Sequence, residues 1–326
     1  MTHNHPNYAT PDHNASGCSQ CAPSRDETNQ VRIRMPDPAL KPANTPNLVT
    51  IDGGSFQMGN HRDDGYPSDG ETPVHTVRVD SFQIAPETVT NTQFAEFIAA
   101  TGYRTEAGSF GWSFVFAGFL PEDFPETRGV EAARWWRQVY GAAWDHPEGP
   151  HSSIATRGNH PVTHVSWHDA MAFCAWSGTR LPAEAEWEFA ARGGSAASHF
   201  WWGDQLTPNG THRMNAWQGT FPARNSAADG YPGTAPVRSY EPNGYGLYNM
   251  TGNVWEWCGD WFEPGYYGRG PEDNPPGAES GTHRVMRGGS YLCHESYCNR
   301  HRVDSRSAAT PDSSTGNTGF RVANSI

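Results

Sequence analysis

Short hydrophobic runs separated by turn residues, rather than long amphipathic periods, characterise this chain. Strands are predicted at residues 48–51, 55–59 and 75–79, because each run is rich in β-branched or aromatic residues and ends at a glycine or aspartate. Three helices are expected, each opened by a capping signal ahead of apolar residues at helical spacing. Their starts are the capping box Thr90-x-x-Gln93, the capping box Ser166-x-x-Asp169 and Pro182 as the first helical residue, and their ends are Gly102, Gly178 and Gly193.

The segment after Gly194 contains no long periodic stretch, yet it is dense in aromatic residues. The chain of 326 residues has 35 Gly, 26 Pro and 13 Trp, which is typical of a packed but irregular backbone. Such backbone needs side-chain caps or bound ions to satisfy its carbonyls. We therefore predict an α+β fold with little regular secondary structure, in a single compact domain over residues 46–326. Residues 1–45, rich in Pro, Asn and His without a hydrophobic period, are predicted to form a disordered tail.

Charge and composition exclude several classes of function. The net charge of −12 argues against nucleic-acid and anionic-membrane partners, because phosphate groups bind positive surfaces. The single lysine, Lys41, lies in the predicted tail, so Schiff-base and phosphate chemistry that depends on lysine is excluded from the domain. No apolar run is long enough to span a membrane, and the polar N-terminus does not resemble a secretory signal. Six cysteines are too few for a disulfide scaffold, and together these features predict a cytoplasmic protein.

Two cysteines of the predicted tail, Cys18 and Cys21, form a C-x-x-C pair near His3, His5 and His13. The strand–helix context that accompanies redox C-x-x-C motifs is missing here. The pair is therefore interpreted as part of a flexible tail that binds metals adventitiously, with a specific metal or redox role as the alternative.

The most distinctive local feature is a second pair, Cys293 and Cys298, which follows the turn Gly288-Gly289. Four interpretations fit the residues alone: a structural thiol pair, a disulfide, a zinc site and a Cu(I) site. Zinc requires two further ligands, for which His294 and His301 are the candidates, whereas two thiolates satisfy Cu(I). A disulfide is disfavoured in a reducing compartment.

Two clusters of oxygen-bearing side chains have the chemistry to bind a hard cation such as calcium. One contains Asn249 and Glu256 with glycine-bent carbonyls between them, and the other contains Asn215 and Asp229. The alternative for both clusters is a tight turn in which asparagine side chains cap the backbone.

Other reactive side chains are expected to be structural. Cys174 and Cys258 lie among apolar residues and are predicted to be core thiols. Three glutamates point in different directions around one helix and cannot all share one site: Glu184, Glu186 and Glu188. Three histidines spaced four apart are separated by a proline and a predicted helix cap, so they are also assigned to structure: His160, His164 and His168.

Seven motifs, in order along the chain, resemble the sulfatase-modifying-factor superfamily. They are Gly53-Gly-Ser-Phe-Gln-Met-Gly59, Glu71-Thr-Pro-Val-His75, Pro161-Val-Thr-His-Val-Ser-Trp167, Thr179-Arg-Leu-Pro-Ala-Glu-Ala-Glu-Trp-Glu188, Asn243-Gly-Tyr-Gly-Leu-Tyr-Asn249, Gly252-Asn-Val-Trp-Glu-Trp257 and Gly319-Phe-Arg321. The resemblance covers almost all of the chain after the predicted tail and implies the C-type-lectin-like fold of that superfamily. Because its members differ in function, the fold alone does not imply an activity.

Within the superfamily, residues 288–298 and the segment Thr310-Pro-Asp-Ser-Ser314 resemble the formylglycine-generating enzymes. The resemblance implies that Cys293 and Cys298 bind Cu(I), and that the chain uses O2 to oxidise a cysteine to formylglycine. The implied substrate is an unfolded or peptide-like sulfatase segment Cys-x-Pro-x-Arg, whose cysteine joins the copper as a third soft ligand. By the same resemblance the protein is a monomer, and the other residues in or near the pocket are Ser290, Tyr297, Trp255, His294 and Arg300.

The resemblance also implies two structural calcium sites at the oxygen-rich clusters. The implied ligands of the first site are Asn215, Asp229 and the carbonyls of Ala216 and Tyr231. Those of the second site are Asn249, Glu256 and the carbonyls of Gly252 and Val254. Ions at these places would satisfy backbone groups that regular elements leave without partners.

Departures from the family pattern indicate a bacterial, cytoplasmic member. Positions that carry disulfide cysteines in metazoan members are here Ala191, Val303 and Val322, so Cys174 lacks its family partner. Two other functions of the scaffold stay as alternatives. A non-haem iron sulfoxide synthase needs a His-rich site and a further helical domain, and a lectin-like binding module uses calcium without catalysis. Neither requires the thiol pair, which therefore favours the copper oxidase.

Overall fold

The computed structural model describes residues 20–25, 31, 33–43, 46–62, 64–131, 133–195 and 198–326. Within these ranges the α-helices are α1 (Asn91–Thr101), α2 (Glu106–Phe110), α3 (Trp167–Ser177) and α4 (Glu184–Arg192). The strands are β1 (Val49–Ile51), β2 (Gly54–Met58), β3 (His75–Val79), β4 (Phe82–Ile84), β5 (Trp112–Phe116), β6 (Gly129–Val130), β7 (Ala133–Tyr140), β8 (Gly219–Thr220), β9 (Arg224–Asn225), β10 (Trp255–Trp261), β11 (Arg284–Arg287), β12 (Arg306–Ala309), β13 (Thr318–Gly319) and β14 (Ala323–Ser325). Single 3-10 turns are η1 (Pro67–Asp69), η2 (Ala117–Phe119), η3 (Pro208–Gly210) and η4 (Tyr266–Gly268). None of the helices in these ranges is long and apolar enough to cross a bilayer.

The caps of α1 and α3 confirm two of the three helix predictions. Thr90 and Ser166 are the N-caps, and each forms a capping box with the side chain three residues further on. Gly102 and Gly178 end the two helices in the left-handed region, with φ of 64° and 70°.

The start of α4 differs from the prediction. Pro182 is not the first helical residue, because the helix begins at Glu184 and Ala183 is its N-cap. The Glu186 side chain accepts a hydrogen bond from the Ala183 backbone N–H at 2.9 Å, which fixes the first turn without a proline. Gly193 ends the helix with φ of 58°, as expected.

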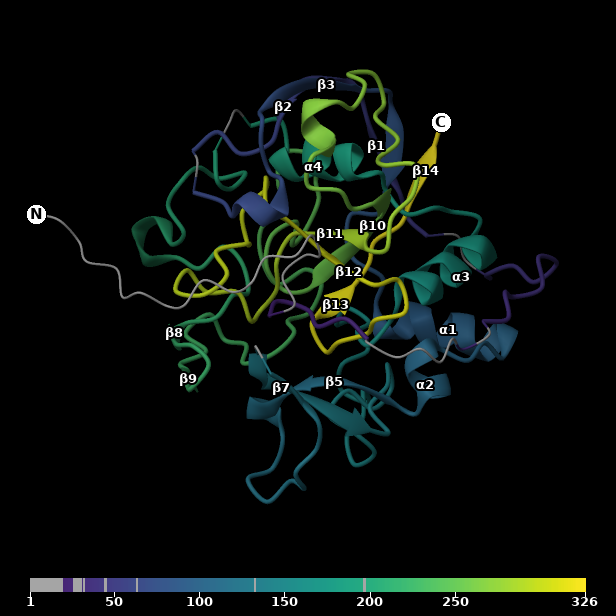
Figure 1. The fold of residues 1–326 in the computed structure, drawn as a ribbon. Helices are drawn as coiled ribbons and strands as arrows, with labels where there is room; N and C mark the ends of the chain where they lie inside the picture. The colour runs from purple at the N-terminus through teal and green to yellow at the C-terminus, as the bar shows by residue number, and fades with distance from the viewer. Residues whose placement is uncertain are drawn as a thin grey trace, which may run out of the picture.

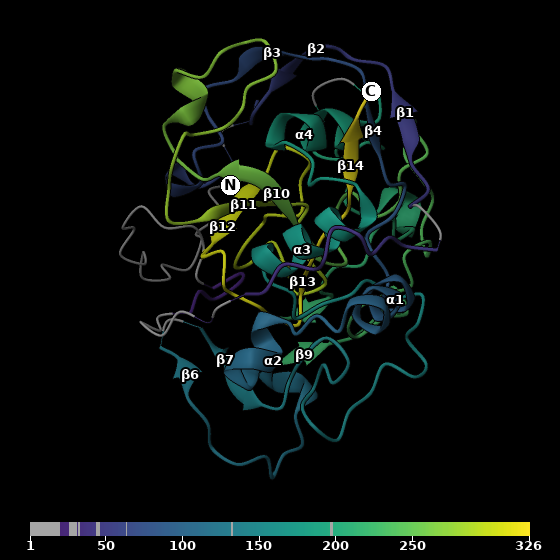
Figure 2. The same cartoon turned by 90° about the vertical axis from the view of Figure 1, so that its right-hand side faces the viewer.

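A four-stranded sheet in the order β12-β11-β10-β13 lies at the centre of the molecule (Figure 1). Strand β10 pairs antiparallel with β11 and parallel with β13. The β2–β3 pair and α4 lie at one end of this sheet, and the sheet β5-β7-β6 lies at the opposite end, as the rotated view also shows (Figure 2). Short helices and short, mixed sheets confirm the predicted α+β class with little regular secondary structure.

The sheet of β5, β6 and β7 is not predicted by the hydrophobic pattern. Every residue of β5 is buried, so the strand lacks the apolar–polar alternation that marks a half-buried strand. Strand β5 pairs with β7 from Trp112 opposite Tyr140 to Phe116 opposite Trp136. Through Trp112 and Trp136 this sheet becomes one wall of the site described below.

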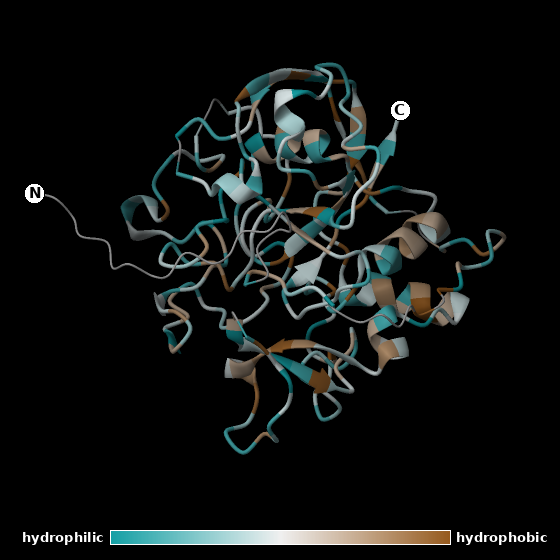
Figure 3. Ribbon diagram, in the orientation of Figure 1, coloured by the Kyte–Doolittle hydropathy of each residue, from teal (hydrophilic) through white to brown (hydrophobic). Residues whose placement is uncertain are grey.

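Aromatic side chains build the core between α1 and α3, where the ribbon is coloured as hydrophobic (Figure 3). Phe94 of α1 stacks on Phe173 of α3 with ring centroids 6.1 Å apart, and Phe97 meets the same ring edge-on at 5.6 Å. Offset and edge-to-face contacts of this kind stabilise aromatic cores beyond simple burial. Cys174 lies in this cluster and Cys258 in the neighbouring one, which confirms the prediction that both are core thiols.

Buried arginines paired with carboxylates form a second, polar core. Arg321 holds Glu256 through two contacts of 2.6 Å, and Arg306 holds Glu184 through two contacts of 2.8 Å. Arginine suits these places because its planar group binds a carboxylate with two parallel hydrogen bonds, which lysine cannot do. The near-absence of lysine therefore matches a fold in which buried arginines such as Arg306 and Arg321 are placed by forked hydrogen bonds.

The prediction of a disordered tail over residues 1–45 does not hold for Gln20–Arg25. Cys21 and Ala22 are fully buried and share a hydrophobic cluster with Cys293 and Cys298. Ile33, further along the predicted tail, also packs against this cluster. Residues 1–19, Cys18 among them, and 26–30 lie outside the described part of the chain.

Candidate active site

The thiol pair lies on the loop that joins β11 to β12. Gly288 and Gly289 turn the chain out of β11 with φ of 92° and 72°, and a Cβ on Gly289 would lie 2.5 Å from the Arg300 carbonyl. Only glycine therefore allows this close approach of the two ends of the loop. Both Cys293 and Cys298 are 0% exposed, so the loop carries its thiols inward.

The two cysteines are thiols in contact with each other, not a disulfide. Burial raises the pKa of Cys293 well above its usual value, and contact with Cys298 adds to the effect. Burial alone would also raise the pKa of Cys298, but hydrogen bonds from Cys21 and Cys293 and the charge of Arg300 hold it well below its usual range. The pair therefore favours a single thiolate over two, because the two sulfur atoms are buried in contact with each other.

Ser290 and Asn317 form the polar floor beside Cys293. The Ser290 backbone N–H lies 3.4 Å from the Cys293 sulfur, and its hydroxyl accepts a hydrogen bond of 2.9 Å from the Asn317 side chain. The indole of Trp255 is fully buried in the same cluster as both cysteines. Sequence analysis selected Ser290 and Trp255 but missed Asn317, which precedes β13 and carries no local motif.

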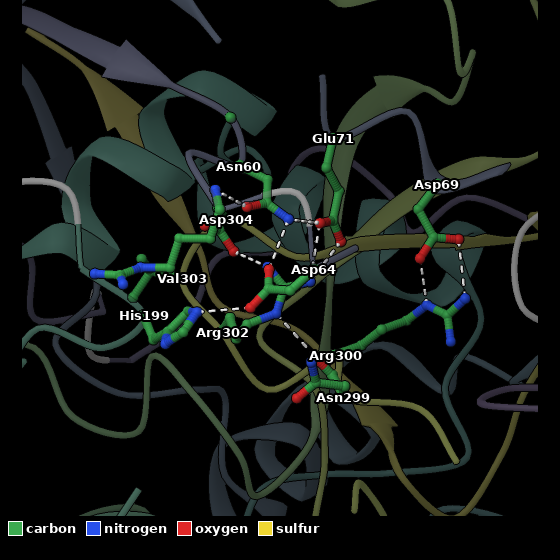
Figure 4. A network of polar contacts seen from close by, with 12 residues as sticks. Asn60, Asp64, Asp69, Glu71, His199, Asn299, Arg300, Arg302, Val303 and Asp304 are labelled. Atoms are coloured by element: carbon green, nitrogen blue, oxygen red, sulfur yellow. Dashed lines mark hydrogen bonds and ion pairs between the residues drawn. The ribbon is translucent and has the colours of Figure 1, made fainter. Parts of the chain in front are cut away.

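Arg300 is fixed beside the thiols by Asp69, which the sequence analysis did not identify. Its guanidinium binds Asp69 at 2.5 and 3.0 Å, and Figure 4 shows the two side chains facing each other. The adjacent Arg302 contacts Glu71 at 2.9 Å and Asp304 at 2.5 Å. These ion pairs tie the residues after Cys298 to the η1 region, so the position of the thiol depends on a distant segment.

Two of the predicted pocket residues, Tyr297 and His294, have side-chain contacts outside the thiol pair. Tyr297 is half-buried and stacks on Phe221 with ring centroids 3.9 Å apart and planes 8° apart, next to Trp135. The His294 ring bonds the Ser296 hydroxyl at 2.7 Å. The backbone carbonyl of His294 accepts the Cys298 N–H at 3.0 Å, so this residue supports the loop through its backbone.

The zinc interpretation finds no support in the surroundings of the pair. Within the described ranges no group of three or more His, Cys, Asp or Glu side chains is placed to hold a metal ion. The His301 ring is buried against Phe200, and burial lowers its pKa to about 4. The loop itself therefore offers two thiols to a soft metal.

The first oxygen-rich cluster contains unsatisfied oxygens. Asn215 Oδ1 and Asp229 Oδ2 are buried and form no hydrogen bond with a described residue, while the Tyr240 hydroxyl lies near the Asp229 carboxylate. The opposite ends of these side chains are fixed, because Asn215 Nδ2 donates to the Gly233 carbonyl at 2.7 Å and Asp229 Oδ1 accepts from the Tyr231 N–H at 3.1 Å. Buried oxygens without donors are the donor set that a hard cation uses.

The second cluster fits a cation less completely. Asn249 Oδ1 is buried without a donor among the described residues, and its Nδ2 donates to the Val237 carbonyl at 3.0 Å. Both oxygens of Glu256 already accept hydrogen bonds from Arg321, and Trp187 donates to one of them at 2.8 Å. The Glu256 carboxylate thus has a counter-ion in the protein itself.

The fold and the loop together define a sulfatase-modifying-factor type of protein. Residues 34–326 match the family described as "Sulfatase-modifying factor enzyme 1-like domain", and the chain belongs to this family. The structure of PvdO from Pseudomonas aeruginosa has a similar fold, with a TM-score of 0.63 and 26% identity over 88% of this chain and 100% of that chain.

Relatives named formylglycine-generating enzyme are similar over most of their length. The protein from Streptomyces coelicolor is 56% identical over 89% of this chain and 92% of its own, and that from Mus musculus is 51% identical over 87% and 76%. A Bos taurus protein named "Inactive C-alpha-formylglycine-generating enzyme 2" is 44% identical over 86% and 88%. These matches confirm the resemblance inferred from the sequence. Since relatives named active and inactive both match, the residues of the site must carry any statement about activity.

Proposed function

We propose that this chain is a copper-dependent oxidase that converts a cysteine in a Cys-x-Pro-x-Arg segment of a sulfatase to formylglycine with O2. The observation that carries this proposal is the buried contact between the Cys293 and Cys298 thiols on the β11–β12 loop. Relatives named for this activity at 51 to 56% identity support it.

The donor set of the loop fits Cu(I). Two sulfur atoms satisfy a soft monovalent ion and leave room for one more thiolate, whereas zinc and iron ask for three or four donors. Bound Cu(I) would supply the redox chemistry with O2. Ser290 and Asn317 orient the Cys293 side chain. Arg300 lies beside the place where the substrate cysteine would bind, and its guanidinium is held there by Asp69. Hydrogen bonds already hold these groups in position before a substrate cysteine binds.

The alternatives receive less support from the described residues. A His-rich iron site is not supported, because no group of three or more His, Cys, Asp or Glu side chains among the described residues is placed to hold a metal ion. A calcium-dependent binding module would use the oxygen-rich clusters but gives no reason for two buried thiols in contact.

We also propose a structural calcium ion at the first oxygen-rich cluster. Asn215, Asp229 and the carbonyls of Ala216 and Tyr231 would hold it, and the two orphaned side-chain oxygens support this assignment. At the second cluster, Asn249 with the carbonyls of Gly252 and Val254 would be the ligands. Glu256 would complete that site while remaining paired with Arg321, since each carboxylate oxygen has a further lone pair.

The copper proposal is tested by conversion of a Cys-x-Pro-x-Arg peptide in the presence of Cu(I), O2 and a thiol reductant. Mass spectrometry should show the aldehyde with wild-type protein, and Cys293→Ser or Cys298→Ser should lower the rate on the order of 10²-fold or more, because one soft ligand is lost. Cu(I) affinity, measured by competition with a chromophoric chelator, should fall in the same two variants.

Cys174→Ser is the matched control, because Cys174 is an equally buried thiol in the same hydrophobic cluster but belongs to α3. It should retain both activity and Cu(I) affinity. Full activity of Cys298→Ser, or conversion that continues with the metal chelated, would contradict the proposal.

A further inference from the structure

Residues Gln20–Arg25 form a segment that ends at the thiol pair, with a turn at Gln20–Cys21 and a bend at Ala22. The surface that holds this segment, which includes Trp112, Trp136 and Asn317, is called the groove below. In Figure 1 this purple segment passes between the central sheet and the β5–β7 sheet, and Figure 2 shows the same arrangement. Cys21 and Ala22 are 0 and 1% exposed and Arg25 is 4% exposed. A segment from the N-terminal tail is therefore as deeply buried as the core of the domain.

Hydrogen bonds to the backbone of this segment come from both walls of the groove. Trp136 of β7 donates to the Gln20 carbonyl at 2.9 Å, and Asn317 donates to the Cys21 carbonyl at 3.0 Å. The same Asn317 amide donates to Ser290, so one side chain joins the segment to the floor of the site. Hydrogen bonds to backbone carbonyls fix the register of a bound peptide independently of its side chains.

Arg25 fills a pocket shaped for a guanidinium group. Its side chain donates to the carbonyls of Asp312 and Trp112 at 3.0 and 2.8 Å and to the Ser314 hydroxyl at 2.8 Å. The cation lies 3.9 Å from the centre of the Trp112 ring and 4.4 Å from that of Phe110. Several donors in a planar fork over an aromatic face are specific to arginine.

Cys21 lies at the other end of the segment, against the thiol pair. Its thiol hydrogen-bonds Cys298, and its sulfur is 3.5 Å from a guanidinium nitrogen of Arg300. The distance from Cys21 to Arg25 along the chain is that of the Cys-x-Pro-x-Arg substrate, and the residue between them at the proline position is Pro23. Every fixed position of the proposed substrate is thus present in the docked segment.

We propose that residues 21–25, Cys-Ala-Pro-Ser-Arg, are a substrate segment held in cis, and that Cys21 is a self-modification site of this chain. This inference rests on the proposed function. The thiol-bearing Cβ of Cys21 would become an aldehyde carbon, with O2 as oxidant and a thiol compound as co-reductant.

The Cβ–S bond of Cys21 breaks in this reaction and a C=O bond forms. One Cys21 thiol, one O2 and two molecules of the reducing thiol give one aldehyde, one hydrogen sulfide, one water and one disulfide of the reductant. O2 gains four electrons, two from Cys21 and two from the reducing thiol. Both atoms of O2 are reduced to water, and one water is consumed when the oxidised Cβ–S group is hydrolysed to the aldehyde and hydrogen sulfide, so the net yield is one water and atoms and electrons balance.

The test is to locate the aldehyde on the full chain after purification without metal and exposure to Cu(I), O2 and a thiol reductant. An aminooxy probe should label Cys21 and leave Cys18 unlabelled, as located by mass spectrometry of the tryptic peptide that contains both. The rate should be independent of protein concentration. Arg25→Ala should slow labelling on the order of tenfold or more, because charge-assisted hydrogen bonds are lost. Arg34→Ala, an exposed arginine of the same N-terminal region, should label as wild type.

A chain that converts an added peptide while Cys21 stays a thiol would overturn self-modification. Failure to convert either cysteine would instead contradict the proposed function.

Occupation of the groove is measured separately, without metal or O2, by the fluorescence anisotropy of a labelled Ser-x-Pro-x-Arg peptide. Arg25→Ala should bind this peptide on the order of tenfold more tightly than wild type, because the cis segment no longer competes as strongly. Arg34→Ala should bind as wild type. Equal affinities for wild type and Arg25→Ala would show that the segment does not occupy the groove, and would overturn the inference whatever the activity.

Discussion

At the scale of single residues, the contacts around a buried group decide its protonation. Burial raises the pKa of Cys174 to about 12 and that of Cys258 well above its usual value, so both are inert thiols. Cys298 is equally buried, yet its thiol and guanidinium neighbours shift its pKa the other way. The neighbours of Cys298 thus distinguish it from the two core thiols, whereas exposure does not, because all three are buried.

Buried His164 should make folding sensitive to acid. Burial lowers its pKa to about 3, and its ring bonds the Ser113 hydroxyl at 2.8 Å. Between pH 6.5 and about 3 the unfolded chain binds a proton that the folded chain does not, so stability falls as pH falls, by up to about 1.4 kcal/mol per pH unit. His164→Asn, which tolerates the φ of 58° at this position, should flatten this slope in urea titrations at several pH values. The exposed control His61→Asn should leave it unchanged, and an unchanged slope in His164→Asn would contradict the assignment.

At the scale of elements, short helices are positioned by caps and by buried ion pairs. On α4, Glu184 and Glu188 are one turn apart and both contact Arg287, whereas Glu186 pairs with Arg180. This confirms that the three glutamates do not share one site. The carboxylates of one helix thereby anchor the end of β11, from which the loop with the thiol pair begins.

The capping box of α1 should contribute measurably to stability. The Thr90 hydroxyl accepts the Gln93 N–H at 3.2 Å, and the Gln93 side chain accepts the Thr90 N–H at 2.8 Å. Thr90→Ala removes one acceptor and should lower the free energy of unfolding by about 1 kcal/mol in urea titrations. Thr90→Ser keeps the hydroxyl and should stay close to wild type. Equal loss in both variants would assign the effect to the threonine methyl group instead.

At the scale of the whole molecule, side chains replace many of the hydrogen bonds of regular structure. Asn243 donates to the Ala190 carbonyl at the end of α4 and accepts the Leu247 N–H at 3.1 Å, so it joins a loop to a helix. Asn253 accepts a hydrogen bond from the Ala235 N–H and donates one to the Ala235 carbonyl, so it joins two loops. Where such a partner is missing, as at Asn215 and Asp229, the proposed calcium ion completes the network.

Calcium removal should therefore destabilise the whole domain. A site saturated at about 100 times its Kd stabilises the folded state by about 2.7 kcal/mol, so a calcium chelator should lower the Tm in a thermal scan and added calcium should restore it. Asp229→Ala should reduce this calcium-dependent shift, since it removes a proposed ligand. Asp273→Ala, at an exposed aspartate, should keep the full shift. A chelator-insensitive Tm in wild type would contradict the calcium proposal.

The sequence by itself determined the features that depend on neighbours a few residues away. Local spacing and the pattern of apolar residues were enough to predict the caps of α1 and α3, the core positions of Cys174 and Cys258, and the family motifs. It did not indicate the fully buried strand β5, because a strand without alternation resembles any apolar run.

Only the tertiary structure brought the remaining parts of the site together. Asp69 and Arg300 are 231 positions apart, and Cys21 and Asn317 are 296 positions apart. No periodicity or motif links residues at such separations, because their contact follows from how whole elements pack around irregular loops. The sequence therefore singled out the thiol pair and suggested the chemistry proposed for it, while the packing decided what holds Arg300 and which segment of the chain lies against the thiols.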